Sequence, residues 1–162
     1  IRNPGTFYHQ SGSALAWMSG TGYYNLWTGR YCDIAHADNG AQLIKTIYDP
    51  SPRGYKIPAS NAFTGFSRTN IEGPFVYGFN FKTGTGSEPA TVFFAASGYR
   101  NFSNGIVGGL GSEGYYWVSI PSGADVAYQL GFASAAPVLP RVEPKYSHAR
   151  SYCYNVRPVT ED

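Results

Sequence analysis

The pattern of apolar and polar positions predicts short β-strands over much of the chain. The clearest strand is 75–82, in which aromatic residues alternate with smaller or polar ones. A turn at 83–87 and a partner strand at 91–95 follow it. Further strands are expected where β-compatible residues or weaker alternation recur, at 41–48, 55–58, 127–132 and 152–159.

Glycine and proline separate these runs and indicate where the chain turns. Two prolines and a glycine predict a turn at 49–54, and Asn104–Gly105 is typical of a β-hairpin. Ser60 is a suitable N-cap for a helix of about two turns near 60–66. Three prolines in 135–144 exclude a helix or a central strand there.

Residues 118–152 stand apart from this pattern. They carry few charges, many small side chains and little helical or strand period. Such a composition is unusual for a core and suits a displayed surface. We therefore expect 118–152 to be a surface segment held in place by the flanking stretches 114–119 and 154–159.

Composition favours a single β-rich or loop-rich domain spanning 1–162. Aromatic residues make up 17% of the chain and charged residues 14%, with 20 glycines and 11 prolines. Rings supply much of the buried area in such a chain, and helix-forming Leu and Glu are scarce. The net charge is +2 and the basic residues are scattered, which argues against nucleic-acid binding. No apolar run is long enough to span a membrane.

No constellation of catalytic or metal-binding residues emerges from the sequence. Cys32 and Cys153 fit a disulfide in an exported protein, two free thiols, or half of a metal site. His36 lies four residues after Cys32, but a full zinc ligand set is lacking. The histidines and acidic residues are scattered, and no nucleophile motif is present. We therefore predict no enzyme activity, no metal and no cofactor.

Three separate motifs, in order along the chain, resemble one known family. They are 49–63 (DPSPRGYKIPASNAF), 93–100 (FFAASGYR), and 114–117 (GYYW) followed by 128–132 (YQLGF) and 156–159 (VRPV). These segments are similar to the Fibrobacter succinogenes major paralogous domain. That domain often forms the C-terminus of fimbrillin-type surface proteins of Bacteroidetes.

The resemblance implies an α+β fold, C-type-lectin-like and of the formylglycine-generating-enzyme branch. Such a fold has a twisted antiparallel sheet, long loops and one or two short helices. The resemblance also implies an extracellular or outer-membrane location, with an N-terminal pilin-like or anchoring domain in a longer protein. Trp117 would be the buried anchor of the sheet, and Tyr99, Arg100 and Arg157 would be structural.

The sequence departs from two active relatives of that fold. It lacks the sugar-binding motifs of calcium-dependent lectins, and a calcium site needs more carboxylates than the tail offers. The formylglycine-generating branch uses two nearby cysteines, whereas Cys153 stands alone in its region. An unusual enzyme of that type would require thiol chemistry at Cys153.

The resemblance favours a non-enzymatic ligand-binding or adhesin domain whose partner is a protein or glycan on a host or microbial surface. Some lectin-fold relatives are variable proteins of diversity-generating retroelements, and 118–152 resembles their diversified segment. Ordinary loop drift explains the same composition. The alternative function is a structural module that assembles or caps a pilus.

The residues expected to contact a ligand lie in 118–152, and Tyr154 lies just beyond that segment. Tyr146, Tyr152 and Tyr154 are suited to stacking on sugars or binding a protein partner, although we expect Tyr152 or Tyr154 to face the core. The full set of candidate ligand-binding residues is Val118, Ile120, Ser122, Asp125, Val126, Gln129, Ala133, Ala135, Arg141, Val142, Tyr146, His148 and Tyr152.

Overall fold

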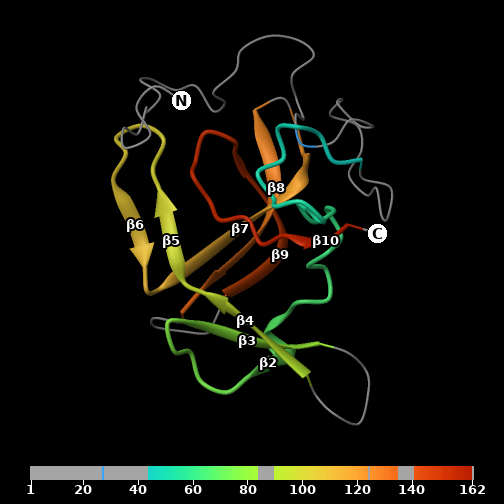
Figure 1. Ribbon diagram of the computed structural model, residues 1–162. Helices are drawn as coiled ribbons and strands as arrows, with labels where there is room; N and C mark the ends of the chain where they lie inside the picture. The colour runs from blue at the N-terminus through green and yellow to red at the C-terminus, as the bar shows by residue number, and fades with distance from the viewer. Residues whose placement is uncertain (1–26, 28–43, 84–89, 124, 135–140, 162) are drawn as a thin grey trace.

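The computed structural model describes residues 27, 44–83, 90–123, 125–134 and 141–161. These residues form antiparallel β-sheets joined by turns and irregular segments (Figure 1). The longest strands make a three-stranded sheet in the order β7–β8–β9, with the bounds Glu113–Pro121, Val126–Ala133 and Arg141–Ala149.

Three smaller sheets complete the architecture. One is three-stranded in the order β2–β3–β4, with the bounds Ile71–Glu72, Gly78–Thr83 and Ala90–Ala95. Two further pairs join β5 to β6 and β1 to β10, with the bounds Ser97–Arg100, Val107–Leu110, Tyr55–Lys56 and Val159–Thr160. All strand pairs between these elements are antiparallel.

The expected α+β class is wrong, because the described residues are almost entirely β and resemble a sandwich. The one helical element among them is the short 3₁₀ helix η1, Arg68–Asn70. The predicted α-helix at 60–66 is instead a succession of turns, with Ala62, Thr64 and Phe66 each donating to the carbonyl three residues earlier. Phe66 stacks on Phe81 at 4.4 Å between ring centroids, so tertiary packing overrides the helical spacing.

The segment 118–152, expected to have little strand period, is mostly strand, and the strand predicted at 127–132 is confirmed as part of β8. β7, β8 and β9 run through it as a meander, and β8 is the central strand. The prediction that prolines exclude a central strand is confirmed, because β9 lies at the sheet edge. Its register jumps between the pairs Gln129–Tyr146 and Gly131–Glu143, which places Pro144 in a bulge where no ladder N–H is needed.

Aromatic rings between the two three-stranded sheets form the core. Phe79 and Phe81 of β3 contact Phe132 of β8 at 5.5 and 6.1 Å, and Phe94 of β4 meets Tyr116 of β7 edge to face at 4.9 Å. The remaining buried members of this phenylalanine core are Phe63, Ala96, Val118 and Leu130. The predicted strand pair 75–82 with 91–95 is therefore confirmed in its main part.

The start of that strand differs from the prediction. Tyr77 was expected on the same buried face as Phe79 and Phe81, but it is 74% exposed and has a φ of 52°. β3 begins only at Gly78, where an added Cβ would lie 2.3 Å from the Phe94 carbonyl oxygen. This close approach of two backbones needs a glycine, and it redirects the chain before it.

The first motif of the family resemblance forms a hydrogen-bonded turn. The Asp49 carboxylate is buried and accepts from the backbone N–H groups of Ser51 (2.8 Å) and Ile57 (3.0 Å). At the base of this turn, Lys45 Nζ donates to the carbonyls of Ser51 and Tyr55. The turn at 49–54 is confirmed, whereas the described part of the predicted strand 41–48 contains no strand.

The predicted closing strand at 152–159 is mostly wrong. Cys153 and Asn155 make isolated bridges to Arg100 and Tyr116, and only Val159 enters a strand, β10. The alternating tyrosines before it pack on the β7–β8–β9 sheet instead of pairing in a ladder. The hairpin predicted at Asn104–Gly105 is confirmed, since it joins β5 to β6.

Replacing Gly114 by alanine should destabilise the fold. An added Cβ would lie 2.1 Å from Cζ of the Phe132 ring, which is fully buried and cannot retreat. Overpacking of this kind costs about 1–3 kcal/mol. Urea unfolding should show that loss for Gly114→Ala. Gly65→Ala is the matched control, since its added Cβ meets nothing within 4 Å. Equal midpoints for the two variants would contradict the packing described here.

Candidate ligand-binding face

The β7–β8–β9 sheet has two different faces because side chains alternate along a strand. Tyr116, Val118, Leu130 and Phe132 point into the phenylalanine core. The cross-strand register places the following residues together on the opposite side: Glu113, Tyr115 and Trp117 of β7, Gln129, Gly131 and Ala133 of β8, and Arg141, Glu143, Tyr146 and His148 of β9. We call this side, with Tyr99, Tyr152 and Tyr154 packed on it, the aromatic face.

Tyr154 lies at the centre of the aromatic face. Its ring stacks on Tyr115 at 4.8 Å and on Tyr152 at 5.4 Å, and it meets Trp117 at 4.6 Å. The backbone fixes this position, because Trp117 donates to the Asn155 carbonyl (2.9 Å) and Asn155 donates to the Tyr115 carbonyl (3.0 Å). The tail is therefore bound along β7, and its tyrosines cover the sheet.

A row of rings continues from this centre towards solvent. Tyr152 meets His148 edge to face at 4.5 Å, and the rings of His148 and Tyr146 lie 6.1 Å apart. Tyr99 and Phe102 contact Tyr152 from the other side, at 5.6 and 5.0 Å. Tyr146 ends the row and is 41% exposed. The face thus changes from buried rings at its centre to accessible rings at its rim.

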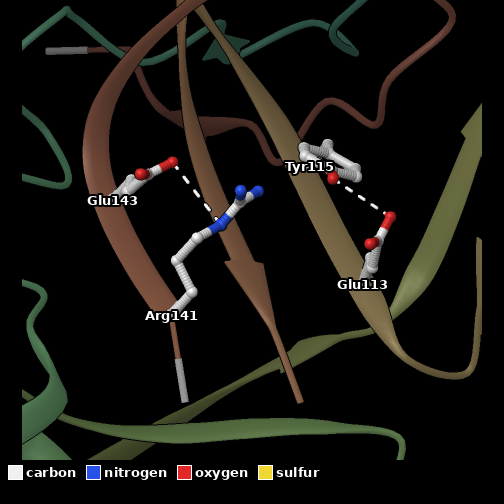
Figure 2. Close-up of polar contacts among 4 residues, drawn as sticks. All are labelled: Glu113, Tyr115, Arg141 and Glu143. Atoms are coloured by element: carbon white, nitrogen blue, oxygen red, sulfur yellow. Dashed lines mark hydrogen bonds and ion pairs between the residues drawn. The ribbon is translucent and has the colours of Figure 1, made fainter. Parts of the chain in front are cut away.

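Charged groups lie beside these rings. Arg141 and Glu143 form an ion pair with 3.6 Å between Nε and Oε2, and the Tyr115 hydroxyl donates to Glu113 Oε2 at 3.0 Å (Figure 2). Burial, and next the negative charge of Glu113, raise the pKa of Tyr115 to about 12. Burial also raises the pKa of Tyr154 above its usual range. Both hydroxyls therefore stay protonated near neutral pH and act as hydrogen-bonding groups.

The residues expected to be structural lie in different places, and Arg157, expected on the terminal strand, precedes β10. Trp117 is buried in the sheet. Arg157 donates from Nη1 to the Phe93 carbonyl at 2.5 Å, and its guanidinium lies 4.5 Å from the centre of the Phe94 ring. Arg100 donates to the Gly105 carbonyl at 2.9 Å, which closes the hairpin, and the ring of Tyr99 packs among the tyrosines of the face.

The structure brings six of the residues expected to bind ligand together on the aromatic face. They are Gln129, Ala133, Arg141, Tyr146, His148 and Tyr152. Ser122, Asp125 and Val126 lie at the β7–β8 turn instead, where Ser122 donates to the Val126 carbonyl and Arg150 to that of Asp125. Ala135 lies outside the described residues.

The expectation that the whole segment is displayed is wrong at several positions. Val118, Ile120 and Gln129 are buried, and Val142 packs against the phenylalanine core. In a sheet that is covered on both faces, side chains that point to either face are buried. A strand without alternating apolar and polar residues is therefore not necessarily exposed. Any diversified surface on this segment would have to use the exposed subset.

Sequence reasoning did not select Glu113, Tyr115 or Glu143 as site residues. Glu113 and Tyr115 share one face of β7 with Trp117, and this two-residue spacing is the signal that could have found them. Glu143 could not be found in this way, because the bulge at Pro144 breaks the period between it and Tyr146.

The described residues offer little for thiol or metal chemistry. Cys153 is exposed and unbridged, and burial of its sulfur raises the pKa of the thiol. Among the described residues, no three His, Cys, Asp or Glu side chains gather as a metal site would require. The same residues include no helix with the length and hydropathy to cross a bilayer.

No family model, curated protein or solved structure matches this chain. Its function is therefore argued from the aromatic face.

Acidification should destabilise the protein through His148. Burial lowers the pKa of His148, and the positive charge of Arg141 lowers it further, from an ordinary value of 6.5. Below that value the unfolded chain binds a proton at His148 that the folded chain binds only at lower pH. Stability is therefore lost as the pH falls below 6.5 towards the folded-state pKa.

Urea unfolding at about pH 7.5 and about pH 5.5 tests this expectation. The loss of unfolding free energy between the two should be smaller in His148→Gln than in the wild type. Because the unfolding free energy of each protein is compared with its own value at the other pH, the packing change caused by the substitution cancels. Identical losses in the two proteins would show that the His148 pKa is not lowered by folding.

Proposed function

We propose that this chain is a non-enzymatic ligand-binding domain of the bacterial cell surface, and that the aromatic face is its binding surface. The observation that carries the proposal is the row of rings that becomes accessible at Tyr146 next to the Arg141–Glu143 pair. The cell-surface location rests on the resemblance to the Fibrobacter succinogenes major paralogous domain.

The chemistry of the face supports binding. Tyrosine rings offer a rigid apolar surface with a polar tip, which suits sugars and protein partners at small cost in side-chain entropy. The rings beneath Tyr146 and Tyr152 are held by stacking, so the face is largely preorganised. The Tyr115, Tyr154 and Cys153 pKa values are shifted upward, away from neutral pH, which disfavours their use as general bases or nucleophiles.

Replacing Tyr146 by alanine should weaken ligand binding while leaving the fold intact. Tyr146 is the accessible ring of the row, and loss of an aromatic side chain that anchors a ligand costs more than about 1 kcal/mol, or roughly fivefold in affinity. The purified domain is applied to a glycan array and to epithelial cells, and bound protein is measured.

Tyr55→Ala is the matched control, because Tyr55 is 46% exposed and lies on β1, away from the aromatic face. It should bind like the wild type. If Tyr146→Ala binds every surface as strongly as Tyr55→Ala does, the aromatic face is not the binding surface.

A second candidate function is a structural module of a pilus or similar assembly. It is favoured by exposed apolar side chains outside the aromatic face, at Val76, Tyr77, Phe93 and Leu110. These residues adjoin one another: Gly111, next to Leu110, lies under the Tyr77 ring, and Gly78 lies against the Phe93 ring. Contiguous exposed apolar groups of this kind are typical of protein–protein contacts.

The double variant Tyr77→Ser/Leu110→Ser distinguishes the two functions. An assembly module should self-associate with rising concentration in sedimentation velocity, and the double variant should remain monomeric. Tyr146→Ala should self-associate like the wild type. A wild-type protein that stays monomeric at all concentrations would contradict assembly of the domain with its own kind.

A further inference from the structure

Arg141 lies on the aromatic face and, among the described residues, makes few polar contacts. Its side chain is 47% exposed, and Nε lies 3.6 Å from Glu143 Oε2, which is beyond a good hydrogen bond. The contact drawn to that carboxylate is made by Nε and not by the two terminal nitrogens (Figure 2). Within the described residues, Arg141 makes this ion pair and a contact with the Tyr146 ring, whose centre is 6.0 Å from Cζ.

Two polar atoms near Arg141 lack hydrogen-bond partners among the described residues. Glu143 Oε2 and His148 Nδ1 are both shielded from solvent and make no hydrogen bond. Shielded polar atoms without partners are costly and uncommon in native proteins. Arg141 can only donate and Glu143 can only accept, so together they offer both halves of the hydrogen bonding that a hydroxyl group uses.

The charges on this side favour a neutral ligand. Glu113 and Glu143 are acidic, Arg141 is basic, and the lowered pKa of His148 keeps that ring uncharged near neutral pH. An anionic ligand at Arg141 would meet the carboxylate of Glu143 at close range. A cationic ligand would meet Arg141 itself. A neutral molecule with several hydroxyls meets neither repulsion.

We propose that the aromatic face binds a neutral saccharide, with Arg141 and Glu143 sharing two adjacent hydroxyls of one sugar while Tyr146 stacks on its ring. The proposal rests on the function proposed above and names the ligand class for the same face. Arg141 donates hydrogen bonds to the hydroxyl oxygens, and the Glu143 carboxylate accepts hydrogen bonds from the hydroxyl O–H groups. The apolar C–H side of the sugar covers the Tyr146 ring, which is the accessible end of the row.

A folded protein partner fits this face less well. Among the described residues, the large apolar side chains with the greatest exposure lie elsewhere, including Ile47, Tyr77, Ile106 and Leu110. The aromatic face exposes Tyr146 at its rim and surrounds it with charged groups. Protein hot spots instead need a well-packed, desolvated centre.

The test compares neutral and acidic glycans on an array and then by calorimetry with the best neutral and acidic binders. The wild type should bind neutral glycans, and its affinity should change little between about 50 and about 500 mM NaCl, because no net charge is neutralised. Arg141→Lys and Glu143→Gln should each lower the affinity about tenfold or more, as expected for a lost hydrogen bond to a charged group. Tyr146→Phe should retain binding, since the stacking ring remains.

Glu72→Gln is the matched control, because Glu72 is an exposed carboxylate on β2 and should bind like the wild type. Both site variants should unfold at the wild-type urea concentration, since Arg141 is about half exposed.

The outcomes separate the two proposals. Selective binding of acidic glycans that falls steeply with salt would overturn the proposal of a neutral ligand, while the aromatic face would remain the proposed binding surface. Binding to cells that depends on Tyr146 but not on any glycan would overturn the proposal of a saccharide ligand, while the aromatic face would remain the proposed binding surface. Neutral-glycan binding unaffected by Arg141→Lys and Glu143→Gln would overturn the assigned residues. Glycan binding that survives Tyr146→Ala would overturn both proposals.

Discussion

The structure depends on β8 being covered on both sides. Leu130 and Phe132 are fully buried in the phenylalanine core, while Gln129 and Gly131, on the other side, lie beneath the aromatic face. The contact between Phe132 and Gly114 sets the spacing of β7 and β8, because the ring occupies the volume of a missing side chain. A strand buried in this way cannot slip by one residue without moving Leu130 and Phe132 out of the phenylalanine core.

The aromatic face depends in turn on the tail. Asn155 holds the tail beside β7 through two backbone bonds, and its side chain donates to the Tyr115 carbonyl at 3.1 Å and to Ser97 Oγ at 2.6 Å. Those contacts place Tyr154 over Tyr115 and bring Tyr152 to His148. The position of the proposed binding rings is therefore set by backbone pairing, while the rings themselves keep their exposed edges for a ligand.

Sequence reasoning succeeded where structure is local. The pair of strands around Phe81 and Phe94 and the hairpin at Asn104–Gly105 follow from alternation and turn chemistry alone. The helix expected at 60–66 failed because the rings of Phe63 and Phe66 serve a core assembled from distant strands. For the same reason the exposure of 118–152 was misjudged: Gln129 is polar, yet it is fully buried on the central strand between Trp117 of β7 and Tyr146 of β9. The candidate site was predicted in part, because the bulged register of β9 brings Arg141, Tyr146 and His148 to one face and the tail adds Tyr152, and neither can be seen in the sequence.

Buried polar atoms without hydrogen bonds lower the stability of the protein, and several of them lie on the face proposed to bind ligand. Both amide atoms of Gln129, together with His148 Nδ1 and Glu143 Oε2, are shielded without hydrogen bonds, and each such group subtracts from the stability that the ring contacts supply. An apolar residue at these positions would fold with less cost, so packing alone does not explain them. These three side chains lie on the aromatic face, and the hydroxyls of Ser51, Ser119 and Ser151 are buried without hydrogen bonds as well. The phenylalanine core on the other side of the same sheet is built from apolar side chains and Tyr116. The Tyr116 hydroxyl is satisfied, since it donates to the Ala95 carbonyl at 2.8 Å. Gln129, Glu143 and His148 therefore place buried polar atoms without hydrogen bonds on the side with the accessible rings, whereas the described residues of the phenylalanine core hold none, and this difference between the two faces supports the proposed binding surface.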